Sequence, residues 1–310
     1  MPLLQASQDY EGAWACRRRL AARAYRGLVA LAATRLWARL PAARQARLLS
    51  GGGLGAGALW NGFMREGEPA LHDASFVVML RRRLLLDLLG APATCAFQYS
   101  GSAGGGGEER QGACGRPLDV AGLHALQCPV GPHRIRLHNE IVRALADWIS
   151  AHGGYADVER CVPEFYREAG GQITEARLDL VVSWPGLPVP TWVDVTVRSP
   201  GESGPAARAA GHAAMGAERH KKDRYGDAVV AFAVETEGRL GPAAQRFVAE
   251  VATAARRTAV LPGEPSGRLG MDFARQVSAK VSGALTARLA DLLLAATLPD
   301  AAPAGARRQS

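Results

Sequence analysis

Long apolar runs are absent from this 310-residue sequence, because arginine soon interrupts every stretch of leucine and alanine. We therefore expect no membrane-spanning helix. Residues 1–19 lack the basic segment followed by an apolar one that marks a secretory signal, so we expect an intracellular protein. Five cysteines, an odd number, then argue against a disulfide framework. Cys16 and Cys161 stand alone and are expected to be buried, unreactive thiols.

Lysine is also scarce: only three of the 37 basic residues are lysines, and two of them, Lys221 and Lys222, are adjacent. A lysine offers a compact charge that suits a single phosphate oxygen or a nucleophilic water, a role that the arginine fork fills differently. Lys221 shares a helical face with Tyr225, whereas Lys222 shares its face with Glu218. We therefore expect Lys221 to point inward, within roughly 4–6 Å of a carboxylate. The alternative is that both lysines are solvated and that Lys222 pairs with Glu218.

Positive charge is concentrated at the start of the chain. The formal net charge is +8, and residues 1–90 hold thirteen arginines against six acidic residues, a balance of +7. A basic leading segment suggests a polyanionic partner such as a nucleic acid, although an ordinary solvated helical surface would carry the same charge. With 48% hydrophobic and 21% charged residues, the chain has the composition of a globular protein.

Hydrophobic periodicity divides the chain into a helical first part and a mixed second part. Apolar residues at three- and four-residue spacing, or alanine-rich composition, predict helices over 14–40, 75–89, 138–150, 206–225 and 273–294. Short β-rich runs predict strands over 176–182, 192–197 and 228–234. This order predicts an α/β domain with a central mixed sheet. The expected regions are a basic helical region (1–93), a Cys/His segment with a glycine-rich insertion (94–133), the α/β core (134–258) and a C-terminal helix with a disordered tail (259–310).

Two aspartates, Asp179 and Asp194, lie inside the first two predicted strands. An unpaired buried carboxylate is strongly disfavoured, so each needs a cation or several hydrogen-bond donors. If the two runs form a hairpin, the carboxylates can converge and bind Mg²⁺, which prefers oxygen ligands and can activate water for phosphodiester cleavage. The alternative is that each aspartate pairs with a nearby arginine, such as Arg177 or Arg198.

A second group of potential ligands ends at Cys128. His124 and Cys128 are four residues apart, so on a helix they face the same side and can bind one tetrahedral Zn²⁺. Cys114 would be the third ligand. Cys95 is a candidate fourth ligand across a glycine-rich loop, because a loop insertion adds little closure entropy. His133 is the alternative ligand, and a metal-free remnant is the alternative to a zinc site.

These motifs resemble the restriction-like endonuclease domain of non-LTR retrotransposon polyproteins, which has the PD-(D/E)XK nuclease fold. Asp179 is similar to the acid of that family's Arg-Pro-Asp motif, and Asp194 to a second acid in a DVTV-like context. The helix that carries Lys221, Lys222 and Tyr225 resembles a Lys/Tyr-bearing helix downstream. The Cys/His segment and the run Arg136-Leu137-His138-Asn139 resemble the Cys-Cys-His-Cys zinc knuckle and the Arg-x-His-Asn motif that precede this nuclease. The resemblance covers roughly residues 58–250.

The resemblance implies a restriction-endonuclease-like core that hydrolyses DNA with Mg²⁺ or Mn²⁺, in a nuclear protein. Asp179, Asp194 and Glu164 would bind this metal, and Glu140 is a weaker candidate for an accessory acid. Lys221 or Lys222 would position water or stabilise phosphate charge. The knuckle would hold Zn²⁺ through Cys95, Cys114, His124 and Cys128. DNA is the expected partner, the element's RNA a second candidate, and the basic helices and the knuckle would contact the DNA backbone.

Three positions depart from the family pattern: Leu178 replaces proline, Thr196 stands where the wider fold has lysine, and Glu237 replaces an aromatic residue. No Tyr-x-Asp-Asp motif occurs, so the chain is not expected to copy RNA. It resembles the endonuclease end of a mobile-element polyprotein, as a truncated copy would. The alternative functions are a catalytically inactive DNA-binding remnant and a structural α/β domain with no nucleic-acid role.

Overall fold

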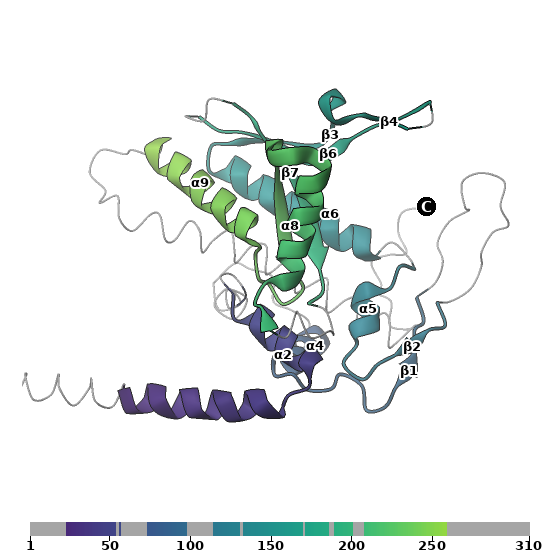
Figure 1. Ribbon diagram of the computed structural model, residues 1–310, viewed down its shortest axis with the longest axis vertical. Coiled ribbons are helices and arrows are strands. Elements are labelled where there is room, and N and C mark those ends of the chain that lie inside the picture. The colour runs from purple at the N-terminus through teal and green to yellow at the C-terminus, as the bar shows by residue number, and fades with distance from the viewer. Residues whose placement is uncertain are drawn as a thin grey trace, which may run out of the picture.

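A mixed sheet of four strands lies at the centre of the fold (Figure 1). Its strands, in the order β3-β6-β7-β8, are Tyr155–Cys161, Arg177–Ser183, Thr191–Arg198 and Val229–Glu235. The first three are antiparallel neighbours, and β8 runs parallel to β7. The computed structural model describes residues 23–53, 56, 73–97, 114–130, 133–169, 171–185, 189–200 and 208–258. The expectation of an α/β domain with a central mixed sheet is confirmed.

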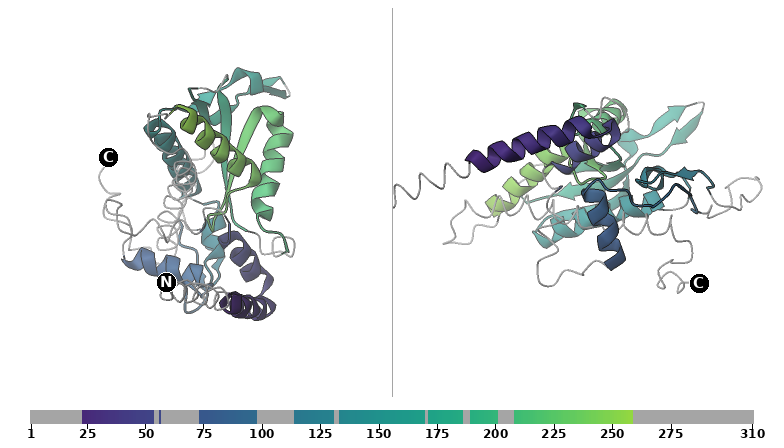
Figure 2. Two further views of the ribbon diagram at one scale, coloured as in Figure 1. Left: turned by 90° about the vertical axis from the view of Figure 1, so that its left-hand side faces the viewer. Right: turned by 90° about the horizontal axis from the view of Figure 1, so that it is seen from below.

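Helices cover both faces of the sheet. Successive side chains of a strand point to opposite faces, so each face presents its own set of apolar residues to a helix. One face packs on α6 (His133–Ala151) and α9 (Pro242–Thr258) through its larger apolar residues: Leu180, Val182, Val193, Val195, Phe232 and Val234. The other face packs on α8 (His212–Tyr225), where small residues, Ala214 and Ala217 against Ala233, allow a close approach. The left view of Figure 2 shows the strands between α8 on one side and α6 and α9 on the other. This layering brings α8 close to the face that carries the two aspartates.

The first part of the chain shares a hydrophobic core with the sheet. Residues 23–39 are helical, followed by α2 (Ala42–Gly51) and α4 (Asp73–Arg83). The Cys/His segment contains the short hairpin of β1 (Ala93–Thr94) and β2 (Pro117–Leu118) and the helix α5 (Leu123–Gln127). Side chains from these elements belong to the core that α6 and the sheet form: Met79, Cys95, Phe97, Leu118, Leu126 and Cys128. None of the described helices is both long enough and apolar enough to cross a membrane.

Smaller elements complete the described fold. The 3₁₀ turn η1 (Pro163–Phe165) follows β3, a hairpin pairs β4 (Arg167–Ala169) with β5 (Gln172–Thr174), and the turn η2 (Gly226–Ala228) follows α8. Figure 1 shows this hairpin projecting beyond the sheet.

Several helix ends differ from the sequence-based predictions. The helix predicted over 75–89 ends at Arg83, because Leu85 adopts a φ of 58° and the Leu88 N–H donates to the Val120 carbonyl instead (2.7 Å). The helix predicted over 206–225 forms regularly from His212, after Gly211 with a φ of 78°. The single helix expected over 14–40 is described from residue 23 and ends at residue 39. Conversely, α6 begins five residues earlier than predicted.

The prediction for Cys161 is wrong, because this thiol is exposed. Cys161 ends β3, which is an edge strand of the sheet, and its side chain lies near the Glu175 carboxylate (3.9 Å). The other solitary cysteine, Cys16, and the helix expected over 273–294 lie outside the described residues.

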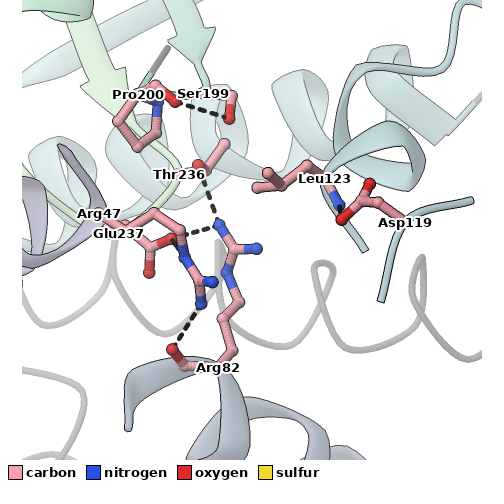
Figure 3. Close-up of polar contacts among 8 residues, drawn as sticks. All are labelled: Arg47, Arg82, Asp119, Leu123, Ser199, Pro200, Thr236 and Glu237. Atoms are coloured by element: carbon pink, nitrogen blue, oxygen red, sulfur yellow. Dashed lines mark hydrogen bonds and ion pairs between the residues drawn. The ribbon is translucent and has the colours of Figure 1, made fainter. Parts of the chain in front are cut away.

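Two buried arginines connect α2 and α4 to the end of β8 (Figure 3). Arg47 donates to the Arg82 carbonyl (2.6 Å) and to Glu237 (3.3 Å), and Arg82 donates to Glu237 and to Thr236 Oγ1 (3.3 Å). Burial lowers the pKa of Arg82 to about 10, although the Glu237 carboxylate acts to raise it. Glu237 therefore lies between two buried positive charges.

These two arginines also correct the interpretation of the basic leading segment. Arg47 and Arg82 are 2% and 0% exposed, so they cannot contact DNA without rearrangement. Arg44 forms an ion pair with Asp87 (2.6 Å). On the helix at 23–39, by contrast, Arg23, Arg35 and Arg39 are exposed.

Candidate active site and metal centre

The two aspartates lie where strands β6 and β7 separate. The β6–β7 pairing extends from Val182 opposite Thr191 to Leu180 opposite Val193. Beyond that pair, β6 continues along β3 and β7 continues along β8. Asp179 and Asp194 are the next residues on the two strands, so they face each other across the start of the gap. Directly opposed residues of antiparallel strands point to the same face, so the hairpin expected from the sequence brings the two carboxylates together.

Side chains replace the sheet hydrogen bonds at this gap. The Val195 N–H donates to Asp179 Oδ2 (2.6 Å), and His138 Nε2 lies 3.1 Å from both Asp179 Oδ2 and the Val195 carbonyl. Because both of these neighbours are acceptors, Nε2 must carry a proton. Burial acts to lower the pKa of His138, but the Asp179 carboxylate outweighs this effect and raises the pKa to about 9. His138 is therefore protonated, and as a cation it holds the Asp179 carboxylate in place.

Lys221 supplies the second cation of this site. Its ammonium lies 2.7 Å from Asp194 Oδ2, and Asp194 is 5% exposed. Burial raises the pKa of Asp194, Lys221 acts to lower it, and the neighbouring Asp179 raises it further. Burial acts to raise the pKa of Asp179 as well, but the His138 and Val195 N–H donors outweigh it and the net direction is downward. The two carboxylates thus interact with each other while each is held by its own cation.

Only one lysine of the adjacent pair points to the aspartates. Lys221 does so, as the helical spacing predicts, whereas Lys222 is exposed and pairs with Asp227 on η2 (2.6 Å). The alternative pair of Lys222 with Glu218 is wrong, because Glu218 instead accepts the Ala243 N–H at the start of α9 (2.9 Å).

The arginine alternative for the aspartates is also wrong. Arg177 pairs with Glu159 (3.7 Å), and Arg198 forms no ion pair with any residue that the structure describes. The cations that neutralise the aspartates therefore come from helices α6 and α8, not from the strands.

The third expected acid is not part of this arrangement. Glu164 lies exposed on η1 and makes no hydrogen bond or ion pair within the described ranges. Glu140 lies half-buried on α6, and Thr196 is buried two residues beyond Asp194. No group of three or more Asp, Glu, His or Cys ligands surrounds the two aspartates in the part of the chain that the structure describes. The roles of Glu164 and Glu140 stay predictions.

The cysteine and histidine ligands predicted from the sequence do converge. Cys95, Cys114, His124 and Cys128 each offer a ligand atom, and these four atoms lie within 4.8 Å of one another. Cys95 thus completes a set of four, and the side chain of His133, the alternative ligand, lies outside the described residues. The cluster can bind a metal ion.

Two of the distances within the cluster match the edges of a tetrahedral zinc site. Zn–S bonds of about 2.3 Å and Zn–N bonds of about 2.0–2.1 Å give tetrahedral edges of about 3.8 Å between two sulfurs and about 3.5 Å between sulfur and nitrogen. The Sγ atoms of Cys95 and Cys128 are 3.8 Å apart, and Cys114 Sγ lies 3.4 Å from His124 Nε2. Burial raises the pKa of Cys128 to about 12 and also raises that of Cys95, so a nearby cation is needed for them to act as thiolates.

The backbone around the cluster explains how the distant Cys95 reaches it. The Cys95 N–H donates to the Arg116 carbonyl (2.9 Å), and the Gly115 N–H donates to the Cys95 carbonyl (3.1 Å). Gly115 has a φ of 66°, which suits a residue without a side chain. The pairing of β1 with β2 therefore continues through Cys95 to the hydrogen bond between Cys114 and Phe97, which brings the two cysteines close together from either side of the insertion.

Asp119 positions the remaining two ligands, a role that the sequence-based predictions missed. Its carboxylate accepts the backbone N–H groups of Ala121, Leu123 and His124 at 3.0, 3.2 and 3.0 Å, which caps the start of α5. His124 and Cys128 lie on this short helix and at its end. An aspartate a few residues before the His-x-x-x-Cys spacing was the signal for this cap.

Comparison of the chain with protein-family models gives no match, and comparison with curated proteins gives none either.

Proposed function

We propose that this chain is a metal-dependent DNA endonuclease that hydrolyses phosphodiester bonds at the gap between β6 and β7. The observation that carries the proposal is the arrangement of Asp179, Asp194 and Lys221: two opposed carboxylates and one inward-pointing ammonium at 2.7 Å from Asp194. Two acids and a lysine at separating strands resemble the catalytic set of PD-(D/E)XK nucleases.

The donor set fits a hard divalent cation. Adjacent carboxylates offer the oxygen ligands that Mg²⁺ and Mn²⁺ prefer, and one or two carboxylates with water and substrate phosphate are a common Mg²⁺ set. When bound, such an ion supplies Lewis acidity and lowers the pKa of water for attack on phosphorus. Glu164 is proposed as an additional ligand from the resemblance alone.

The chain's own side chains have distinct tasks in this scheme. Lys221 can exchange its contact with Asp194 for a phosphate oxygen or the attacking water. His138 orients Asp179 through Nε2, and the Val195 N–H holds the same oxygen. Lys221 thereby takes the place of the strand lysine that Thr196 cannot supply.

The Cys/His cluster is proposed to bind Zn²⁺ as a structural knuckle. Three cysteines and one histidine form a closed ligand set with no position left for substrate, which is typical of structural zinc. The cluster shares its core with α6, which carries His138. Zinc would therefore stabilise the side of the active site that α6 forms.

A DNA-binding protein without nuclease activity is the second candidate function. The observation that favours it is the neutralisation of both carboxylates by the chain's own cations, His138 and Lys221, which satisfies them without a metal.

Nicking of a supercoiled plasmid with Mg²⁺ or Mn²⁺ tests the proposal. Asp194→Asn should lower nicking by more than about a hundredfold, because changes outside the first ligand shell already cost about 10–100-fold. Asp223→Asn, at an exposed aspartate on α8, is the matched control and should nick like the wild type. DNA binding by the purified wild type with no metal-dependent nicking would favour the second candidate.

A further inference from the structure

A groove of about 660 Å³ opens between the Cys/His cluster and the sheet. Its lining comes from the end of α5 and Pro129, the start of α6, the end of β7 with Ser199, and Thr236 just after β8. Its polar lining residues are Gln127, Arg134, His138, Thr196, Arg198, Ser199 and Thr236.

The lining carries positive charge and no acidic residue. Arg134 and Arg198 are exposed, and neither forms an ion pair or a side-chain hydrogen bond with any residue in the described part of the chain. Two unpaired guanidinium groups in a groove without carboxylates favour an anionic ligand.

The groove lies beside the two aspartates, although neither of them lines it. His138 lines it and also contacts Asp179, and Thr196 lines it two residues beyond Asp194 on β7. Asp194, Thr196 and Arg198 lie on the same face of the strand, where two residues advance by about 6.6–6.8 Å. Arg198 is therefore about 13 Å along the strand from Asp194, too far to contact the phosphate held at the aspartates. It is placed to contact another phosphate of the same backbone.

We propose that Arg134 and Arg198 bind backbone phosphates of the DNA strand whose neighbouring phosphate lies at Asp179 and Asp194. The inference rests on the proposed nuclease function and adds to it the path of the bound strand, which runs between the Cys/His cluster and the end of β7. These arginines are positioning residues for the substrate and take no part in the bond that breaks.

Salt-dependent DNA binding by the full chain tests this path separately from catalysis. The probe is a fluorescein-labelled DNA duplex, titrated without added Mg²⁺ at several salt concentrations. Each phosphate contact contributes a slope of about −0.9 to log K against log salt. Arg134→Gln and Arg198→Gln should each reduce the slope by about 0.9 and weaken binding about eightfold at 0.1 M salt, with the double variant losing about 1.8.

Arg143→Gln is the matched control. Arg143 is exposed on the same helix as Arg134, and nine residues at about 100° each place it on the opposite side. Its slope should equal that of the wild type. Equal slopes for all variants, an equal reduction in the control, or no DNA binding by the wild type would each overturn the proposal. Reduced slopes for Arg134→Gln and Arg198→Gln in a protein that does not nick would support the groove and reject the nuclease.

Discussion

Replacing Glu237 with glutamine removes the carboxylate that lies between two buried guanidinium groups. Glu237 accepts hydrogen bonds from Arg47 and Arg82, which are 2% and 0% exposed. Three of their nitrogens, Arg47 Nη1 and Arg82 Nε and Nη1, are already buried without a hydrogen bond. The variant therefore removes the carboxylate that contacts both buried guanidinium groups, and Asp119 stays as a weaker opposite charge near Arg82.

The expected loss of stability is large for one conservative substitution. Removing one partner of a buried ion pair destabilises proteins by about 3–5 kcal/mol, and the retained amide oxygen of glutamine favours the lower value. A loss of about 3 kcal/mol is a substantial part of the roughly 5–15 kcal/mol that stabilises a folded domain. At about 2–4 °C per kcal/mol, the Tm should fall by roughly 6–12 °C.

Urea denaturation and a thermal melt measure this change against Glu250→Gln. Glu250 is exposed on α9, so its substitution should stay within about 0.5 kcal/mol of the wild type. Arg47→Met should be milder than Glu237→Gln, because it leaves the Arg82–Glu237 pair balanced. If Glu237→Gln loses less than about 1 kcal/mol, or if Arg47→Met is the more damaging variant, the charge-balance reasoning is wrong.

Three further predictions follow from the cluster and from α9. Purified protein should contain one zinc ion per chain, and free zinc at a thousand times its Kd should add about 4 kcal/mol to the free energy of unfolding; elemental analysis that finds no zinc contradicts this. Asp119→Ala should weaken zinc binding about 10–100-fold in a chelator competition, since it releases the start of α5, and unchanged affinity would show that the cap is dispensable. Burial raises the pKa of Glu218 above 4.5, although the Ala243 and Ala244 N–H groups act to lower it. The folded state therefore holds the Glu218 proton more tightly than the unfolded state does. The free energy of unfolding of the wild type, relative to that of Glu218→Gln, should fall as pH rises from 4.5 through the folded pKa. Denaturation of both proteins at several pH values measures this difference.

Local sequence patterns were sufficient to predict the positions of three strands and the direction of side chains that depend on residues close together in the chain. Short β-rich runs located β6, β7 and β8 to within one or two residues, and β7 follows β6 as a hairpin that aligns Asp179 with Asp194. Helical spacing separated the inward Lys221 from the outward Lys222. Each of these predictions depends on geometry that a few consecutive residues determine.

The exposed strand β3 and the buried charges could not be predicted in the same way. Strand β3, with the sequence YADVERC, is mostly exposed, and its apolar residues do not alternate regularly, so no period of two marks it as a strand. Arg47 is a basic residue in a helix, which normally indicates solvent exposure, and its partner Glu237 is 190 positions away. His138 stood in the motif Arg-x-His-Asn, but its contact with Asp179 depends on how α6 crosses the sheet.

Plasmid nicking by Lys221→Ala, compared with Lys222→Ala, is the most direct test of the active site at the gap between β6 and β7. Lys221 lies 2.7 Å from Asp194, whereas its neighbour Lys222 pairs with Asp227 at the surface. Lys221→Ala should abolish nicking while the protein stays folded and still binds DNA, with a lower Tm because the buried Asp194 loses its cation. Lys222→Ala should nick at nearly the wild-type rate. Normal nicking by Lys221→Ala, or equal loss in both variants, would contradict the assignment of this ammonium to catalysis.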